Sequence, residues 1–138
     1  MANFTAEGFL KHDDYMTPKS AWENIQQYIP KDKVIWEAFM GDGKSGEYLK
    51  ELGFDVIHND NDFFQNNEGD VIVSNPPFSK SKEVMNRLRK LDKPFIIIMP
   101  CSKLCTSYLV EGWKNACNFD CFYYCYKMNL PRDIIWLE

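Results

Sequence analysis

The stretch KVIWEAFMGDGKSGEYLKELG, residues 33–53, decides the fold class because it runs from an apolar segment through a glycine turn into a helical pattern. The apolar segment Lys33–Phe39 is short and continuous, which is typical of a strand buried in a parallel sheet. The segment Gly46–Leu52 predicts a helix, and Gly53 is the residue type that most often closes one. The stretch therefore predicts one strand–turn–helix unit of an α/β sheet.

The glycine turn within this stretch is compatible with three kinds of ligand. Residues 38–45 match a loose phosphate loop, whereas Gly41, Gly43 and Gly46 match the dinucleotide pattern G-x-G-x-x-G. A third interpretation is the glycine turn that holds S-adenosylmethionine. The phosphate loop is disfavoured because neither later apolar strand ends in an acidic residue that would organise magnesium. Asp60, nineteen residues after Gly41, fits the ribose of either remaining ligand.

The rest of the chain alternates further strands and helices. A helix is expected to begin at Thr17-Pro18, with Thr17 as its cap, and to end before Pro30. Alternating elements predict an open α/β sheet whose ligands bind at the carboxyl ends of the strands. Helices are predicted at residues 81–91 and 102–115, and strands at 54–58, 70–74, 93–100, 119–128 and 133–137, the last two as an antiparallel pair.

Length and composition bound the class of protein. At 138 residues the chain is expected to be a single domain with residues 1–14 flexible, and its 45% hydrophobic and 26% charged residues argue against disorder. The longest apolar run is too short to cross a membrane and the amino terminus lacks a secretory signal, which favours a cytoplasmic protein with no membrane partner. The odd number of cysteines, 5, favours reduced thiols, and their apolar surroundings argue against a metal site.

Positive charge is concentrated in one segment, although the whole chain carries a net charge of −4. Between Ser79 and Lys93 there are six basic and two acidic residues, which gives a local charge of +4. Lys80, Lys82 and Arg87 lie in this segment and are candidates for contact with nucleic acid. A solvated helix face would carry the same charge pattern, so the segment alone does not decide between the two.

Asn75-Pro-Pro-Phe78 follows the predicted strand at residues 70–74 and discriminates between the remaining ligands. Together with the turn at residues 37–43 and the earlier Tyr15-Met-Thr-Pro18, it resembles the motifs of the amino-methyltransferases. Members of this family use S-adenosylmethionine to methylate exocyclic amines, chiefly adenine N6, and carry a (D/N/S)-P-P-(Y/F/W) motif. The resemblance covers about residues 15–100, and the compact chain looks like phage- and virus-encoded members.

The resemblance implies a shortened Rossmann-like class I methyltransferase sheet with a C-terminal antiparallel strand pair, in a single methyltransferase domain spanning residues 1–138. It also implies that the Asn75 amide oxygen and the Pro76 carbonyl accept the two hydrogens of the target amine. The nitrogen lone pair is then localised for attack, and the same oxygens stabilise the developing positive charge. Pro77 stiffens the loop, and Phe78 supplies a flat face for the target base.

For the cofactor, S-adenosylmethionine, the resemblance implies a second group of residues. Gly41 and Gly43 allow the backbone to approach the ligand, and Glu37 would balance the ammonium group of its methionine part. Asp60 is assigned to the ribose hydroxyls, although a turn cap would place the same residue type there. The full set is Tyr15 and Thr17 at the methionine end, Asp62 and Phe63 at the adenine ring, and Glu37, Phe39, Gly41, Gly43 and Asp60.

Two departures from the family pattern leave the acceptor open. Only residues 63–69 separate the second and third strands, so one strand of the usual sheet is expected to be missing. No segment after Pro100 is long enough for a target-recognition domain, so a specificity subunit, a homo-oligomer or low sequence discrimination is expected. DNA adenine is the leading acceptor, with RNA adenine and a protein glutamine amide as alternatives. A noncatalytic binding protein and an NAD-dependent oxidoreductase also remain open.

Overall fold

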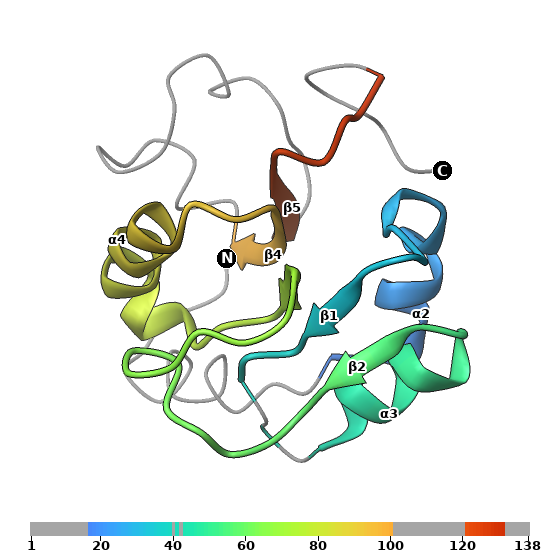
Figure 1. Ribbon diagram of the computed structural model, residues 1–138, viewed down its shortest axis with the longest axis horizontal. Coiled ribbons are helices and arrows are strands. Elements are labelled where there is room, and N and C mark those ends of the chain that lie inside the picture. Colours follow the sequence, from blue (N-terminus) through green and yellow to red (C-terminus); the bar gives the residue numbers. More distant parts are fainter. Residues whose placement is uncertain (1–16, 40, 42, 101–120, 132–138) are drawn as a thin grey trace, which may run out of the picture.

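The computed structural model describes residues 17–39, 41, 43–100 and 121–131, which form an α/β fold around one mixed sheet (Figure 1). Its strands are β1 Val34–Trp36, β2 Asp55–Ile57, β3 Val71–Ser74, β4 Phe95–Pro100 and β5 Cys121–Tyr126. The strand order is β2-β1-β3-β4-β5. The pairs β1–β2, β1–β3 and β3–β4 are parallel, whereas β5 runs antiparallel to β4.

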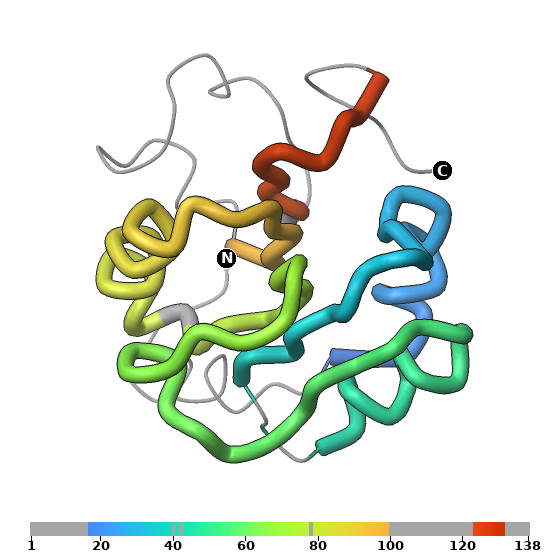
Figure 2. Tube along the Cα trace, in the orientation of Figure 1, coloured from blue at the N-terminus to red at the C-terminus, as the bar shows by residue number. Residues whose placement is uncertain are grey.

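Helices cover both faces of the sheet (Figure 1). They are the α-helices α2 Lys19–Glu23, α3 Lys44–Glu51 and α4 Ser81–Leu91, and the short 3-10 helices η1 Gln26–Tyr28 and η2 Phe78–Lys80. The α2 and α3 helices lie against one face, where Trp22 and Leu49 are fully buried, and α4 lies against the other. The chain trace shows the same layers, with blue α2 and teal α3 on the side away from yellow-green α4 (Figure 2).

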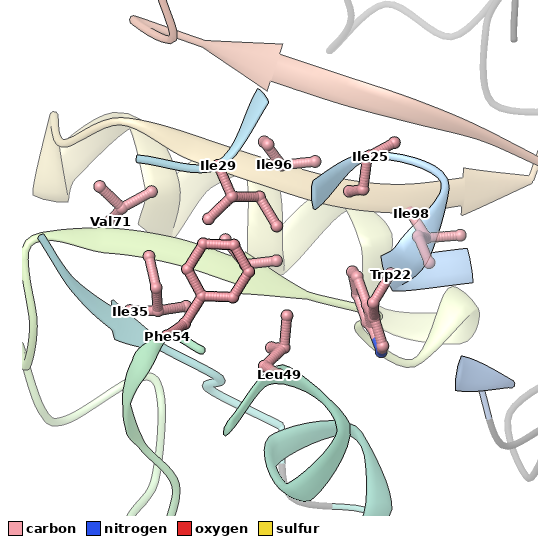
Figure 3. Close-up of a cluster of buried hydrophobic side chains, with 10 residues drawn as sticks. Trp22, Ile25, Ile29, Ile35, Leu49, Phe54, Val71, Ile96 and Ile98 are labelled. Atoms are coloured by element: carbon pink, nitrogen blue, oxygen red, sulfur yellow. The ribbon is translucent and has the colours of Figure 1, made fainter. Parts of the chain in front are cut away.

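Each inner strand divides its side chains between the two faces, because successive side chains of a strand point to opposite sides. In β4, Ile96 and Ile98 join the cluster beneath α2 and α3, whereas Ile97 and Met99 join the cluster beneath α4. Figure 3 shows the first cluster, with Trp22 packed beside the strand residues. Burying one large apolar side chain contributes about 1.5–3 kcal/mol, so these two clusters are the main source of stability.

Most elements predicted from the sequence are confirmed. Residues 33–53 form β1, the turn and α3, and the predicted strands at residues 54–58, 70–74 and 93–100 contain β2, β3 and β4. β5 gives the sheet an antiparallel carboxyl-terminal pair, but its partner is β4 and not the predicted strand at residues 133–137. The predicted flexible segment 1–14, the helix at 102–115 and the strand at 133–137 lie outside the described residues.

The amino-terminal helix is shorter than predicted. Pro18 occupies the cap position of α2 and no side chain makes a capping hydrogen bond, so the prediction that Thr17 caps this helix is wrong. The chain leaves α-helical geometry at Ile25, with φ −119° and ψ 6°, and continues as η1. Trp22, Ile25 and Ile29 are nevertheless all buried, as their helical spacing predicted.

The connection from β2 to β3, residues 58–70, contains neither a helix nor a strand, as its short length predicted. Lys93 holds the end of this connection. Its ammonium donates hydrogen bonds to the carbonyls of Glu68 and Gly69, at 3.0 and 2.9 Å, and lies over the Trp36 ring. Within the described residues, every helix is too short or too polar to cross a lipid bilayer.

Candidate active site

The carboxyl ends of β1 and β3 lie side by side in the middle of the parallel part of the sheet. Trp36 of β1 is in register with Ile72 of β3, so the residues that follow the two strands reach the same edge. The chain leaves β1 toward β2 on one side and returns to β3 on the other. In open α/β sheets, such a reversal of strand order opens the crevice in which ligands bind. The motifs that follow β1 and β3 therefore meet where a ligand site is expected.

Glu37, the first residue after β1, is a carboxyl group enclosed by the protein, with 1% of its surface exposed. Its Oε1 accepts hydrogen bonds from the Phe39 N–H, at 3.0 Å, and from the Ser74 hydroxyl at the end of β3. Burial raises the pKa of Glu37 to about 8, while the two donors act in the opposite direction because they stabilise the carboxylate. The carboxyl is therefore mostly neutral at pH 7 unless a cation approaches it.

Asn75, the first residue after β3, has an amide that the protein engages at one end only. Its Nδ2 donates a hydrogen bond to Thr17 Oγ1 at 2.7 Å. Its Oδ1 is shielded from solvent and has no hydrogen-bond donor among the described residues. An unpaired buried acceptor destabilises a protein by about 1–3 kcal/mol, which is why few are found. The Asn75 oxygen is therefore an acceptor available to a donor that the described chain does not supply.

Two prolines carry the chain from Asn75 into η2. Pro76 is buried and Pro77 is half-buried, and the Pro77 carbonyl accepts a hydrogen bond from the Lys80 N–H at 3.1 Å. Proline has no N–H, so neither residue competes for the acceptor atoms of this loop. Phe78 begins η2, and its predicted stacking on a target base concerns a side chain outside those described.

The turn between β1 and α3 adopts backbone conformations that favour glycine. Gly41 has a φ of 55°, and Gly43, at the cap position of α3, has a φ of 87°. A residue with a Cβ is strained at such angles, so both glycines are required by the turn itself. Met40 and Asp42, the other residues of the turn, lie outside the described residues.

Gly46, the third glycine of the pattern, allows α3 to pack closely on the end of β2. A Cβ at Gly46 would overlap the imidazole of His58, the residue that follows β2. Close packing of a helix against a strand is the role of the third glycine in G-x-G-x-x-G turns. His58 Nε2 is buried and has no partner among the described residues. Sequence reasoning missed this pair, because no spacing rule links a helix glycine to a histidine that follows the next strand.

The residues predicted to bind the ribose and adenine lie in different environments. Asp60 and Asp62 are exposed in the connection that follows β2. Asp62 Oδ1 accepts a hydrogen bond from the backbone N–H two residues later, at 2.8 Å, and so caps a turn. Phe63 is 3% exposed, and its ring centroid lies 5.5 Å from that of Trp36 and 4.8 Å from that of Phe39. Phe63 therefore belongs to the core beneath α4.

The three predicted nucleic-acid contacts separate into two groups. Lys80 and Lys82 are exposed. Arg87 is half-buried, and its guanidinium donates hydrogen bonds to the carbonyls of Phe63, at 3.2 Å, and Asn66, at 2.8 Å. In this structure Arg87 therefore tethers the connection between β2 and β3 to α4, an arrangement that a count of charges does not reveal.

The structure brings Thr17, Glu37 and Asn75 together at one edge, and Ser74 links the ends of β1 and β3 through its bond to Glu37. Ser74 was not predicted to be functional. Its signal in the sequence is a hydroxyl at the last position of an otherwise apolar strand. Tyr15, predicted at the methionine end of the cofactor, lies outside the described residues.

Comparisons of the chain with models of protein families, with curated proteins and with solved structures find no match. A functional assignment therefore depends on the geometry of this edge and on the motifs. In the part of the chain that the structure describes, no three His, Cys, Asp or Glu side chains are grouped to hold a metal ion. Cys125 forms no disulfide, and burial raises the pKa of its thiol to about 12, which disfavours a reactive thiolate.

Proposed function

We propose that the protein is an S-adenosylmethionine-dependent N-methyltransferase that methylates the N6 amine of adenine in DNA. The observation that carries the proposal is the Asn75 amide, whose nitrogen is held by Thr17 and whose buried oxygen has no donor among the described residues. Such an acceptor is satisfied when an N–H donor binds beside it, and an exocyclic amine carries two N–H bonds. The position of Asn75 where the strand order reverses supports a shortened Rossmann-like methyltransferase fold.

The chemistry requires an amine whose lone pair is available. In adenine the N6 lone pair is spread into the ring, so the amine is a weak nucleophile. If Asn75 Oδ1 and the Pro76 carbonyl accept its two hydrogens, the nitrogen becomes more tetrahedral and its lone pair is localised. The cofactor supplies an electrophilic methyl group on a positively charged sulfur. While the N–C bond forms and the S–C bond breaks, the two oxygens stabilise the positive charge on nitrogen, which then loses a proton to water.

Because Asn75 Oδ1 is shielded from solvent, the acceptor amine must take the place of the atoms that shield it. A base that leaves a duplex, or that is already unpaired, presents its amine and its ring together. Binding then exchanges an unpaired acceptor for a hydrogen-bonded one. Since the unpaired state costs about 1–3 kcal/mol, this exchange favours the bound state.

Residues at the same edge suit the charge and shape of the cofactor. Glu37 would pair with the ammonium of the methionine part, because a nearby cation lowers the pKa of a buried carboxyl and makes it ionise. The positive φ angles of Gly41 and Gly43 form a turn without side chains, against which a ligand can lie. Asp60 follows β2, the strand beside β1, and is exposed for contact with ribose hydroxyls.

Nucleic acid as the carrier of the amine is supported by the exposed cations that follow Asn75 in the chain. Lys80 ends η2 and Lys82 lies in the first turn of α4. Both are exposed and would contact backbone phosphates. The net charge of the whole chain is −4, so non-specific attraction to DNA is weak. Sequence recognition would therefore come from a specificity subunit or from a second copy of the chain.

A calorimetric titration with S-adenosylhomocysteine, NAD and ATP tests the cofactor. We expect S-adenosylhomocysteine to bind with a stoichiometry of one, and NAD and ATP not to bind. Binding of NAD alone would favour the oxidoreductase, and binding of none would favour a noncatalytic binding protein.

The same titration tests the role of Glu37. Because the Glu37 carboxyl has a pKa of about 8, pairing with an ammonium at pH 7 should release about one proton. Repeating the titration in buffers of different ionisation enthalpy measures this release. Glu37→Gln should abolish the release, and an equal release in that variant would exclude Glu37 as the partner.

Transfer of a radiolabelled methyl group to separate pools of DNA, RNA and protein identifies the acceptor. We expect label on DNA, recovered as N6-methyladenine after nuclease digestion. Label on RNA or on protein glutamine would retain the N-methyltransferase and change its substrate. No label in any pool, with cofactor binding intact, would contradict the proposed activity.

A further inference from the structure

The hydrogen bond between Asn75 and Thr17 joins two predicted motifs that lie 58 residues apart in the chain. The Nδ2 to Oγ1 distance is 2.7 Å, at the short end of the range for such bonds. Thr17 is 8% exposed, so little water competes for its hydroxyl. The family resemblance assigns Thr17 to the cofactor, yet its hydroxyl contacts the residue that is proposed to bind the acceptor amine.

Thr17 is itself held in position by the helix that follows it. Its next residue is a proline, which restricts Thr17 to an extended backbone. The α2 helix is attached to α3 by a hydrogen bond from Trp22 Nε1 to Ser45 Oγ at 3.2 Å. It is attached to β5 by a hydrogen bond from the Tyr123 hydroxyl to the Ala21 carbonyl at 2.7 Å. The Thr17 hydroxyl is therefore a fixed point to which the Asn75 amide is bonded.

We propose that Thr17 is a positioning residue that anchors the Asn75 amide, so that its oxygen stays directed toward the acceptor amine. This inference rests on the proposed N-methyltransferase function. An asparagine amide presents a donor at one end and an acceptor at the other, and a rotation of about 180° exchanges them. Because Nδ2 is engaged by Thr17, Oδ1 is the atom that meets an incoming N–H.

Without the Thr17 hydroxyl, the amide loses this anchor and can rotate away from the observed orientation. In the reversed orientation Nδ2 faces the amine, so two donors oppose each other and the nitrogen lone pair is not localised. The cofactor still binds to those molecules, but the acceptor is held in a geometry that does not react. The loss therefore falls on kcat rather than on the affinity for the cofactor.

Three substitutions at Thr17 test this role. Thr17→Val keeps the shape of the side chain and removes the hydroxyl, Thr17→Ala removes it without adding a methyl group, and Thr17→Ser keeps it. We expect kcat to fall about fivefold to tenfold in the first two, which corresponds to one hydrogen bond, and to stay within about twofold in Thr17→Ser. The dissociation constant of S-adenosylhomocysteine should stay within about twofold of wild type in all three.

Nuclear magnetic resonance reports on the same contact without turnover. In isotope-labelled protein, the Asn75 side-chain N–H pair is assigned by its absence from Asn75→Asp. This signal should shift in Thr17→Val and remain near its wild-type position in Thr17→Ser. In addition, Thr17→Val should cause no further loss of kcat in an Asn75→Ala background, because Thr17 acts through Asn75.

Four results would overturn the inference. An unchanged Asn75 amide signal in Thr17→Val would show that the contact does not exist in solution. Weaker cofactor binding in Thr17→Val, with or without Asn75, would assign Thr17 to the cofactor. Wild-type kcat in Thr17→Val would remove the positioning role and leave the proposed function intact. An intact contact in a protein that methylates no acceptor would overturn the proposed function and, with it, the role of Thr17.

Discussion

The two sides of the candidate site differ in how firmly the protein holds their polar groups. At the ends of β1 and β3, the Glu37 carboxyl is buried and bonded to Ser74, and the half-buried Asn75 has a shielded amide oxygen and an amide nitrogen bonded to Thr17. After β2, Asp60 is exposed in a connection that contains no helix or strand. The first side therefore has polar groups held by hydrogen bonds and shielded from water, whereas the second has a charged side chain exposed to water.

This difference separates the tasks that each side can perform. Fixed dipoles in a site without water stabilise a developing charge strongly, because they need no reorganisation during the reaction. Their burial also destabilises the fold, since Asn75 Oδ1 lacks a donor and Glu37 is a buried acid. Exposed groups such as Asp60 contribute less to any one contact, because water competes with the ligand. We therefore expect the residues after β1 and β3 to control turnover, and those after β2 to influence the affinity for the cofactor.

Replacement of Asn75 is expected to have the largest effect on turnover. We expect Asn75→Ala to lower kcat about 100-fold to 1000-fold, as loss of a preorganised polar group does in other enzymes, while S-adenosylhomocysteine binds as in wild type. Asn75→Asp keeps the acceptor oxygen and should retain more activity than Asn75→Ala. Asn67→Ala, at an exposed asparagine, is the matched control and should be as active as wild type. Equal kcat in Asn75→Ala and wild type would remove the amide from the mechanism.

Glu37 is expected to make the stability of the folded protein depend on pH. Its pKa is about 8 in the folded chain against an ordinary value of 4.5, so between these pH values the folded state holds a proton that the unfolded state has lost. Its contribution to stability is therefore fully present below about pH 4.5 and is lost as the pH rises toward 8. The expected slope is about 1.4 kcal/mol per pH unit for this one proton.

Urea unfolding at pH 5.5, 6.5 and 7.5 gives the free energy of unfolding of wild type and of Glu37→Gln. The change with pH of the difference between these two free energies measures the slope. We expect Glu37→Gln to become more stable relative to wild type as the pH rises, because glutamine does not ionise. Glu47→Gln, at an exposed glutamate of α3, should follow the wild-type profile. Parallel profiles for wild type and Glu37→Gln would show that the carboxyl is not enclosed as described.

The sheet was predictable from the sequence because its signals are local and periodic. A run such as residues 93–100 is apolar on both faces, and β4 indeed contributes Ile96 to one cluster and Ile97 to the other. The alternation of strands and helices predicted an open sheet with its ligand-binding residues at the carboxyl ends of the strands, whereas the strand order itself comes from the structure. The motif after residues 70–74 accordingly follows the carboxyl end of β3.

The pairing of individual polar atoms was not predictable, because it depends on contacts between distant segments. Thr17 has the local features of a helix cap, but its hydroxyl accepts a bond from Asn75 instead. Arg87 counts as one of several cations in its segment, and only the fold shows that it bonds to the backbone. The raised pKa of Glu37 likewise requires burial that sequence patterns do not measure.

Replacement of Asp60 tests the exposed side. We expect Asp60→Ala to weaken S-adenosylhomocysteine binding about fivefold to tenfold, which corresponds to one solvent-exposed hydrogen bond to a charged group. The kcat at saturating cofactor should change little, in contrast to Asn75→Ala. Asp55→Ala is the matched control, because Asp55 is exposed at the opposite end of β2. A loss of kcat in Asp60→Ala with unchanged cofactor affinity would reverse the division between the two sides.

Replacement of Arg87 has the smallest expected effect of these substitutions. It distinguishes a structural role, in which Arg87 bonds to backbone carbonyls, from contact with phosphate. Arg87→Met keeps an apolar stem but removes the hydrogen bonds to the carbonyls of Phe63 and Asn66, so we expect a loss of about 1 kcal/mol in unfolding free energy. The slope of log affinity for DNA against log salt concentration should stay unchanged. Lys82→Met, at an exposed cation, should lower that slope by about one without loss of stability. The opposite pattern would place Arg87 on the nucleic acid and leave the connection after β2 held by Lys93.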